Sequence, residues 1–109
     1  MELVVEVSGS HSVLVATGEI DLSTSAQVDS AVIAALESQA SHLTLDLTGV
    51  TFLDSSGLGV IVKALKRSRE IGTTFDVVAS NERVLKVFTI TGLDAVITIY
   101  SELSAVPIA

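Results

Sequence analysis

The chain contains no cysteine, no tryptophan and only one proline among its 109 residues. Without cysteine there can be no disulfide framework, no thiolate nucleophile and no cysteine-based metal site. Nothing in the composition therefore marks an oxidising compartment, and the expected location is a reducing cytoplasm.

Long apolar runs are also absent. Apolar residues make up 49% of the chain, yet runs such as GVIVKAL are broken by charge well before the roughly 20 residues that a membrane-spanning helix needs. We therefore expect these residues to fill the core of a single domain over residues 1–109, without a membrane partner. The N-terminal MELVVEV alternates and carries acids, which predicts mature structure and not a signal peptide.

Basic residues are missing from the first 62 positions. The six that occur all come later, and the formal net charge is −7: Lys63, Lys66, Arg67, Arg69, Arg83 and Lys86. Because binding of a polyanion begins with Lys and Arg neutralising phosphates, this balance disfavours nucleic acid as a partner. The acidic first half indicates either a basic partner surface or a solvated surface that keeps the protein soluble.

Changes in hydrophobic period divide the chain into short elements. ELVVEVS and HSVLVATGE are β-branched runs joined by a Gly-Ser turn, which predicts a β-hairpin. HLTLDLTGV, extended by Val50 and Phe52 on its apolar face, predicts another strand, as do IGTTFDVVAS and AVITIY. Helical spacing begins after Thr24, at Ser56 or Gly57 and after Asn81, and SELSAVPIA is expected to add a final helical turn.

The helix ends have capping signals. Ser23 or Thr24 is expected to cap the first helix, with Gln27 completing a capping box. Asp54 and the serines after it precede the second helix. Asn81 or the preceding serine is expected to cap the third helix, and Gly92 to end it.

The predicted order is strand, strand, helix, strand, helix, strand, helix, strand. This order favours an α/β domain with a mixed, mainly parallel sheet, in which the hairpin contributes the antiparallel strand. Sites in such sheets collect where strands end and helices begin. GEIDLST and FLDSSGLG both have that position, so we expect the two loops to open on the same edge.

The segment FLDSSGLGV places an acid, two hydroxyls and two glycines at the start of a helix. Asp54, Ser55 and Ser56 are all good N-cap residues. The same turn is also an anion site, because free amides and the helix dipole favour a phosphate, and Gly57 and Gly59 let the backbone approach it. The residues alone leave both interpretations open.

Enzymatic interpretations fit the residues poorly. Val62 stands where a dinucleotide fingerprint needs its third glycine, and no Gly-Lys-Ser/Thr phosphate loop occurs. A hydrolase elbow needs glycine where this chain has Leu53, and its base would have to be His11 or His42, both expected to be solvated surface histidines. The scattered histidines and carboxylates also suggest no metal site. We therefore expect no catalysis, no cofactor and no metal.

Three segments carry a resemblance to a known family. TGEIDLSTS, LTLDLTGVTFLDSSGLGVIV and NERVLKVFTITGLDAVITIY resemble the anti-sigma factor antagonists of the STAS domain family, in order and across nearly the whole chain. The match in FLDSSGLGV is specific, whereas the strand and helix periodicities are not. The resemblance implies a single STAS domain with helices packed mainly on one face of its sheet, in a bacterial protein.

The resemblance also implies a partner-switching role. In that family the unphosphorylated antagonist binds an anti-sigma factor serine kinase and thereby releases a sigma factor, and a metal-dependent serine phosphatase later restores the binding form. The implied phosphoacceptor is Ser55, with Ser56 as the alternative. The implied neighbours of the phosphoacceptor in the partner-binding surface are Asp21, Asp54, Ser56, Gly57, Leu58 and Gly59. From the residues alone, Asp21 is a loop carboxylate or a polar neighbour of the Ser55 loop.

A second class of function stays open. Other STAS domains are constitutive interaction subunits of signalling complexes or small partners of lipid-transport ATPases, without a phosphoswitch. The intact Asp-Ser-Ser-Gly favours the switch. A phosphate at Ser55 is expected to reduce partner affinity with little change of structure.

Overall fold

The computed structural model describes residues 1–107. Five strands form one sheet in the order β1-β2-β3-β4-β5: β1 (Glu2–Ser8), β2 (His11–Ile20), β3 (His42–Leu53), β4 (Thr74–Val78) and β5 (Thr98–Tyr100). The helices are α1 (Ser25–Glu37), α2 (Ser55–Ile71) and α3 (Glu82–Thr91), with 3₁₀ turns η1 (Leu93–Ala95) and η2 (Leu103–Ala105). The element order is the predicted one.

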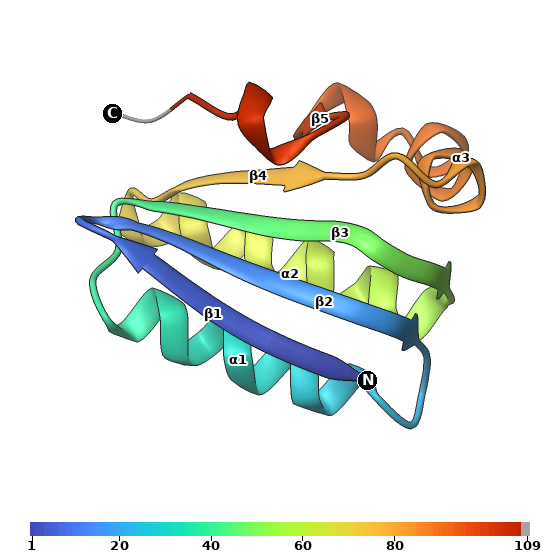
Figure 1. The fold of residues 1–109 in the computed structure, drawn as a ribbon, viewed down its shortest axis with the longest axis horizontal. Coiled ribbons are helices and arrows are strands. Elements are labelled where there is room, and N and C mark those ends of the chain that lie inside the picture. The colour runs from blue at the N-terminus through green and yellow to red at the C-terminus, as the bar shows by residue number, and fades with distance from the viewer. Residues whose placement is uncertain (108–109) are drawn as a thin grey trace.

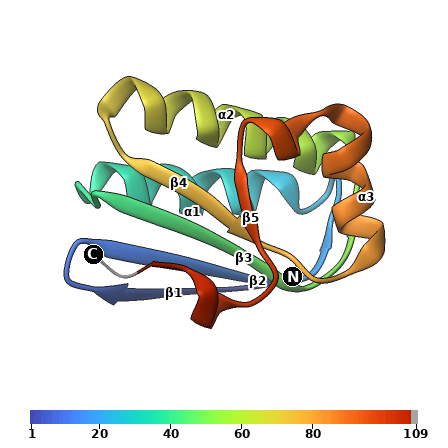
Figure 2. The same ribbon diagram turned by 90° about the horizontal axis from the view of Figure 1, so that it is seen from above.

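The sheet is mixed and mainly parallel, as expected. β1 pairs antiparallel with β2, while β2 to β5 pair in parallel. The helices α1 and α2 pack against each other on one face of the sheet, and α3 lies beyond the end of β4 (Figure 1; Figure 2). None of the helices within residues 1–107 is both long and apolar enough to cross a membrane.

The predicted hairpin is confirmed, with a two-residue turn. Ser8 pairs with His11, and Gly9 between them has a φ of +60°, a conformation that glycine adopts without steric cost. His11 is the first residue of β2.

The core lies between the sheet and the pair α1 and α2. Alternate strand residues face the helices, as the period of two predicted, and the buried set includes Leu14, Ala16, Ile20, Leu43, Leu45, Leu47, Phe75 and Val77. The helices contribute Val28, Val32, Ala35, Leu36, Val60, Ile61 and Ala64 to the same cluster. The apolar residues therefore belong to a core, as the broken runs indicated.

The alternation in β3 does not hold to the end of the strand. Register shifts between β2 and β3 lie between Val15 and Thr17 and between Gly18 and Glu19. Each irregularity moves one residue of β3 out of step. Phe52, predicted on the apolar face, is 44% exposed, and Leu53 is buried in its place. The assignment of Phe52 to the core face was therefore wrong.

The capping predictions are confirmed for two helices and partly for the other. Asn81 caps α3 by accepting from an amide of its first turn, and Gly92 ends it with a φ of +76°. Thr24 occupies the N-cap of α1, but the capping box with Gln27 is wrong because no side-chain cap hydrogen bond forms. The Thr24 hydroxyl instead donates to the Glu19 carbonyl over 2.8 Å.

The C-terminal elements are shorter than predicted. Of AVITIY, only Thr98–Tyr100 forms a strand. The final turn expected in SELSAVPIA is present as η2, and residues 108–109 of that segment lie outside the described residues.

Candidate functional site

The loops that follow β2 and β3 open on the same edge of the sheet, as predicted. The two strands run parallel and end side by side, with Ile20 opposite Leu53. The Asp54 amide donates to the Ile20 carbonyl over 3.1 Å. This bond fixes the start of α2 against the end of β2 (Figure 1).

Asp54 caps α2. Its backbone is extended, and its carboxylate Oδ1 accepts from the amides of Ser56 at 2.8 Å and Gly57 at 3.1 Å. The predicted N-cap is confirmed, but these two amides are not free to hold a phosphate, as the anion-site interpretation required. A phosphate on Ser55 would therefore lie outside the cap and beside a carboxylate.

The two serines after Asp54 differ in exposure. Ser55 is exposed as the first residue of α2, whereas Ser56 is half-buried. Leu58 is half-buried and Gly59 is exposed on the same first turns. Ser55 is therefore the serine that a modifying enzyme reaches more easily.

Asp21 organises the loop after β2. Its Oδ1 accepts from the Ser23 hydroxyl at 2.7 Å, from the Ser23 amide at 3.0 Å and from the Thr24 amide at 3.2 Å. The pKa of the Asp21 carboxyl is lowered, chiefly by the bond from the Ser23 hydroxyl. Asp21 is thus an ionised loop carboxylate that follows Ile20, on the edge where Asp54 follows Leu53.

The two glycines of the motif have different environments. A Cβ on Gly57 would lie 2.5 Å from Ile20 Cγ2 and 2.5 Å from Leu53 Cδ1, whereas one on Gly59 would have no atom within 4 Å. Gly57 therefore lets the first turn of α2 pack directly on the ends of β2 and β3. The sequence predicts the same role for both glycines, which is to let the backbone approach a phosphate.

Exposed apolar side chains border this edge. Leu22, in the loop after β2, is 80% exposed, and Phe52, next to the end of β3, is 44% exposed. Sequence reasoning missed both residues. The exposure of Leu22 could have been predicted from the sequence, because Leu22 is a single apolar residue among polar residues in a loop.

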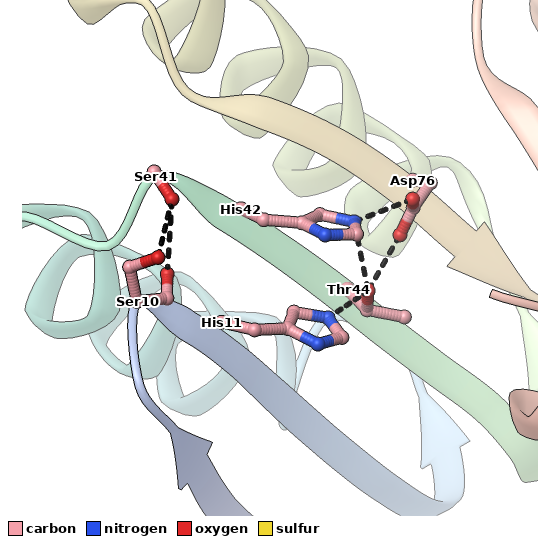
Figure 3. A network of polar contacts seen from close by, with 6 residues as sticks. All are labelled: Ser10, His11, Ser41, His42, Thr44 and Asp76. Carbon is pink, nitrogen blue, oxygen red and sulfur yellow. Dashed lines mark hydrogen bonds and ion pairs between the residues drawn. The ribbon is translucent and has the colours of Figure 1, made fainter. Parts of the chain in front are cut away.

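A polar cluster at the other end of the sheet was also missed (Figure 3). His11 Nε2 lies 2.7 Å from Thr44 Oγ1, and His42 Nε2 lies 2.6 Å from Asp76 Oδ2. Thr44 donates to Asp76 Oδ1 over 2.6 Å, so its oxygen accepts from His11. The two imidazole rings stack with centroids 4.0 Å apart.

The expectation that both histidines are solvated is therefore wrong. The His42 side chain is only 11% exposed, because the register places His11 beside His42 and Thr44 beside Asp76 on adjacent strands. These positions start β2 and β3, whereas Ser55 follows the far end of β3, so no hydrolase triad forms. Across residues 1–107, no group of three or more His, Cys, Asp or Glu side chains is arranged to hold a metal ion.

The cluster predicts a pH dependence of stability. The pKa of His11 is lowered, first by burial and then by His42, with Asp76 acting in the opposite direction. The unfolded chain therefore takes up this proton at higher pH than the folded chain does. The free energy of unfolding should fall as the pH drops through the unfolded pKa of about 6.5, by at most about 1.4 kcal/mol per pH unit for this proton.

Urea denaturation followed by circular dichroism between about pH 7.5 and pH 5.5 measures this dependence. The control is His11→Gln, which keeps a side-chain donor but does not titrate. Its stability should vary less with pH than that of the wild type. An equal pH dependence in both proteins would assign the effect to other groups.

Comparisons with known proteins match this chain to a family. The STAS domain model matches residues 2–106. The chain is 35% identical over 89 residues to an anti-sigma-B factor antagonist of Listeria monocytogenes, across 82% of this chain and 78% of that protein. It is 37% identical over 82 residues to the anti-sigma-B factor antagonist of Bacillus subtilis, across 75% and 74%.

A solved structure agrees with these relatives. The crystal structure of an anti-sigma factor antagonist from Mycobacterium paratuberculosis superposes with a TM-score of 0.89 at 30% sequence identity. The superposition covers 94% of this chain and 87% of that one.

Proposed function

Because this chain belongs to the STAS domain family, we propose that it is an anti-sigma factor antagonist switched by phosphorylation at Ser55. Its unphosphorylated form binds an anti-sigma factor that is also a serine kinase, and this binding releases a sigma factor. The kinase phosphorylates Ser55 and binding ends, and a metal-dependent serine phosphatase restores the binding form. The names of the relatives at 35% and 37% identity support the antagonist role.

The exposure of Ser55 carries the proposal. Its side chain is exposed on the first turn of a helix that Asp54 caps. The helix holds the acceptor in a fixed position beside the loop of Asp21. An acceptor on a rigid, exposed turn suits both docking to a partner and modification by it.

Charge provides the mechanism of the switch. A phosphoserine carries about −1.5 to −2 charges at neutral pH. The Asp54 carboxylate already accepts hydrogen bonds from the amides of Ser56 and Gly57. The phosphate therefore adds to the negative charge of Asp54 and is not neutralised by these amides. The exposed Leu22 and Phe52 on the same edge supply apolar contact area for the partner. Phosphorylation thus places charge and bulk in the middle of the docking surface.

No catalytic activity is proposed for the chain itself. Both histidines lie at the opposite end of the sheet from Ser55. The Asp54 carboxylate caps α2, and the Asp21 carboxylate accepts hydrogen bonds within its own loop. The chain is the substrate and the binding partner of the kinase.

Phosphate mapping on matched serine variants tests the acceptor. We expect the wild type and Ser56→Ala to take up one phosphate each from a candidate kinase and ATP, and Ser55→Ala to take up none. Mass spectrometry of the intact protein and its peptides gives the stoichiometry and the site. Full phosphorylation of Ser55→Ala would overturn the assignment to Ser55, whereas stable binding of every form without phosphorylation would favour the constitutive interaction subunit.

A further inference from the structure

The outer edge of β1 is open and apolar. Within residues 1–107, β1 pairs only with β2 and ends the sheet (Figure 1). Val5 and Val7, on the face that carries the helices, are 50% and 68% exposed, because α1 packs mainly on β2 and α2. Val4, on the opposite face, is 52% exposed. A long apolar edge strand is a ready template for pairing with another strand.

The hairpin register shows which backbone groups face outward. Ser8 and His11 flank the two-residue turn, and the residues in that position exchange hydrogen bonds across the hairpin. Bonding to β2 then alternates along β1, so the N–H and C=O groups of Leu3, Val5 and Val7 point to the open edge. Their side chains lie on the face of the sheet that carries the core, because Val5 pairs with Leu14.

We propose that β1 pairs antiparallel with β1 of a second copy of this chain, about a two-fold axis at Val5. In this register Val5 opposes Val5 and Leu3 opposes Val7. Each opposed pair exchanges two backbone hydrogen bonds. The side chains of Leu3, Val5 and Val7 from both copies form one apolar stripe between the two α1 helices.

Charge selects this register over its neighbours. The outward-facing backbone groups of one copy must lie opposite the outward-facing groups of the other. The two-fold axis must therefore pass through a residue of β1 and not between two residues. An axis at Val4 would set Glu2 against Glu6, and an axis at Glu6 would set that residue against itself. Like charges directly opposite each other destabilise a strand pair. With the axis at Val5, Glu6 faces Val4 and Glu2 faces Ser8.

The resulting dimer leaves the proposed switch free. β2 separates β1 from β3 and the Ser55 loop. The two-fold axis reverses the strand direction, so the two Ser55 loops lie at opposite strand ends of one continuous sheet. An interface along seven residues is smaller than the roughly 800 Å² per partner of a standard complex. The dimer should therefore form in a concentration-dependent equilibrium.

Solution mass tests the pairing. Sedimentation velocity and light scattering should show the mass rising from 11.3 kDa toward twice that value as the concentration increases from about 10 μM to about 1 mM, the range in which small interfaces associate. Val5→Lys places two ammonium groups opposite each other and should keep the protein monomeric. The control Val62→Lys, at a 44% exposed position of α2, should dimerise like the wild type.

Single cysteines test the register, because the natural chain has none. In the proposed pairing the Cα atoms of the two Val5 residues lie about 5.5 Å apart, within the range for a disulfide. The two Val4 residues are diagonal neighbours at about 7–8 Å. Val5→Cys should therefore form a disulfide dimer on mild oxidation much faster than Val4→Cys.

Two results would overturn the proposal. One is a wild-type mass that stays at 11.3 kDa at the highest concentration, and the other is Val4→Cys crosslinking as fast as Val5→Cys. Because β1 is separate from the Ser55 loop, Val5→Lys should still be phosphorylated at Ser55. Failure of the dimer thus remains distinguishable from failure of the proposed antagonist function.

Discussion

Phosphorylation of Ser55 is expected to weaken binding to the anti-sigma factor by about a hundredfold or more, with little change in the fold. Like charges brought together at an interface cost several kcal/mol, and about 2.7 kcal/mol already corresponds to a hundredfold change in dissociation constant. Asp54 holds the amides of Ser56 and Gly57 at 2.8 and 3.1 Å, so these amides cannot neutralise the phosphate. The added charge therefore acts on the partner.

Calorimetric titration of the phosphorylated and unphosphorylated forms measures this loss. Ser55→Asp and Ser55→Asn form a matched pair, equal in size and different in charge. If charge is the cause, only Ser55→Asp should lose most of its affinity. Amide chemical shifts should change only near residues 21–24 and 52–58, so changes throughout the sheet, or equal affinity of the two variants, would contradict this mechanism.

Gly57→Ala is expected to destabilise the domain by about 1–3 kcal/mol, the range for overpacking a tight contact. The added Cβ would lie 2.5 Å from side-chain atoms of Ile20 and Leu53 and 3.0 Å from the Ile20 carbonyl oxygen. The side chains have little room to move because both residues are buried in the core. The first turn of α2 would have to shift away from the strand ends.

Gly59→Ala is the matched control for this prediction. It makes the same substitution two residues later in α2, where a Cβ meets no atom within 4 Å. It should stabilise the domain by up to about 1 kcal/mol through helix propensity. Urea denaturation of the two variants separates steric conflict from propensity, and similar stabilities would show that the contact with Ile20 and Leu53 relaxes freely.

The elements that depend on near neighbours along the chain could be predicted from the sequence. The hairpin turn needs Gly9, the caps need Asp54 and Asn81, and the end of α3 needs Gly92, each within a few residues of the group it serves. The amphipathic periods of the helices likewise reflect positions three or four residues apart. These features gave the element order and placed the two loops on one edge.

Three local predictions were overturned by contacts that the local pattern does not show. Phe52 left the core face because irregular pairing between β2 and β3 changed the alternation. Gln27 formed no capping box because the Thr24 hydroxyl bonds to Glu19. The prediction of two solvated histidines fails because His42 Nε2 lies 2.6 Å from Oδ2 of Asp76, 34 positions along the chain.

The order of strands and helices, the acidic character of the first half, and the Asp54 cap in the Asp-Ser-Ser-Gly segment at the start of α2 follow from the residues alone. The folded structure was needed to show that Ser55 is exposed while Ser56 is half-buried, and that Gly57 packs against Ile20. The difference lies in how far apart along the chain the interacting residues are. Turns and caps follow from neighbouring residues, whereas exposure and contact depend on the register of strands that meet only when the chain has folded.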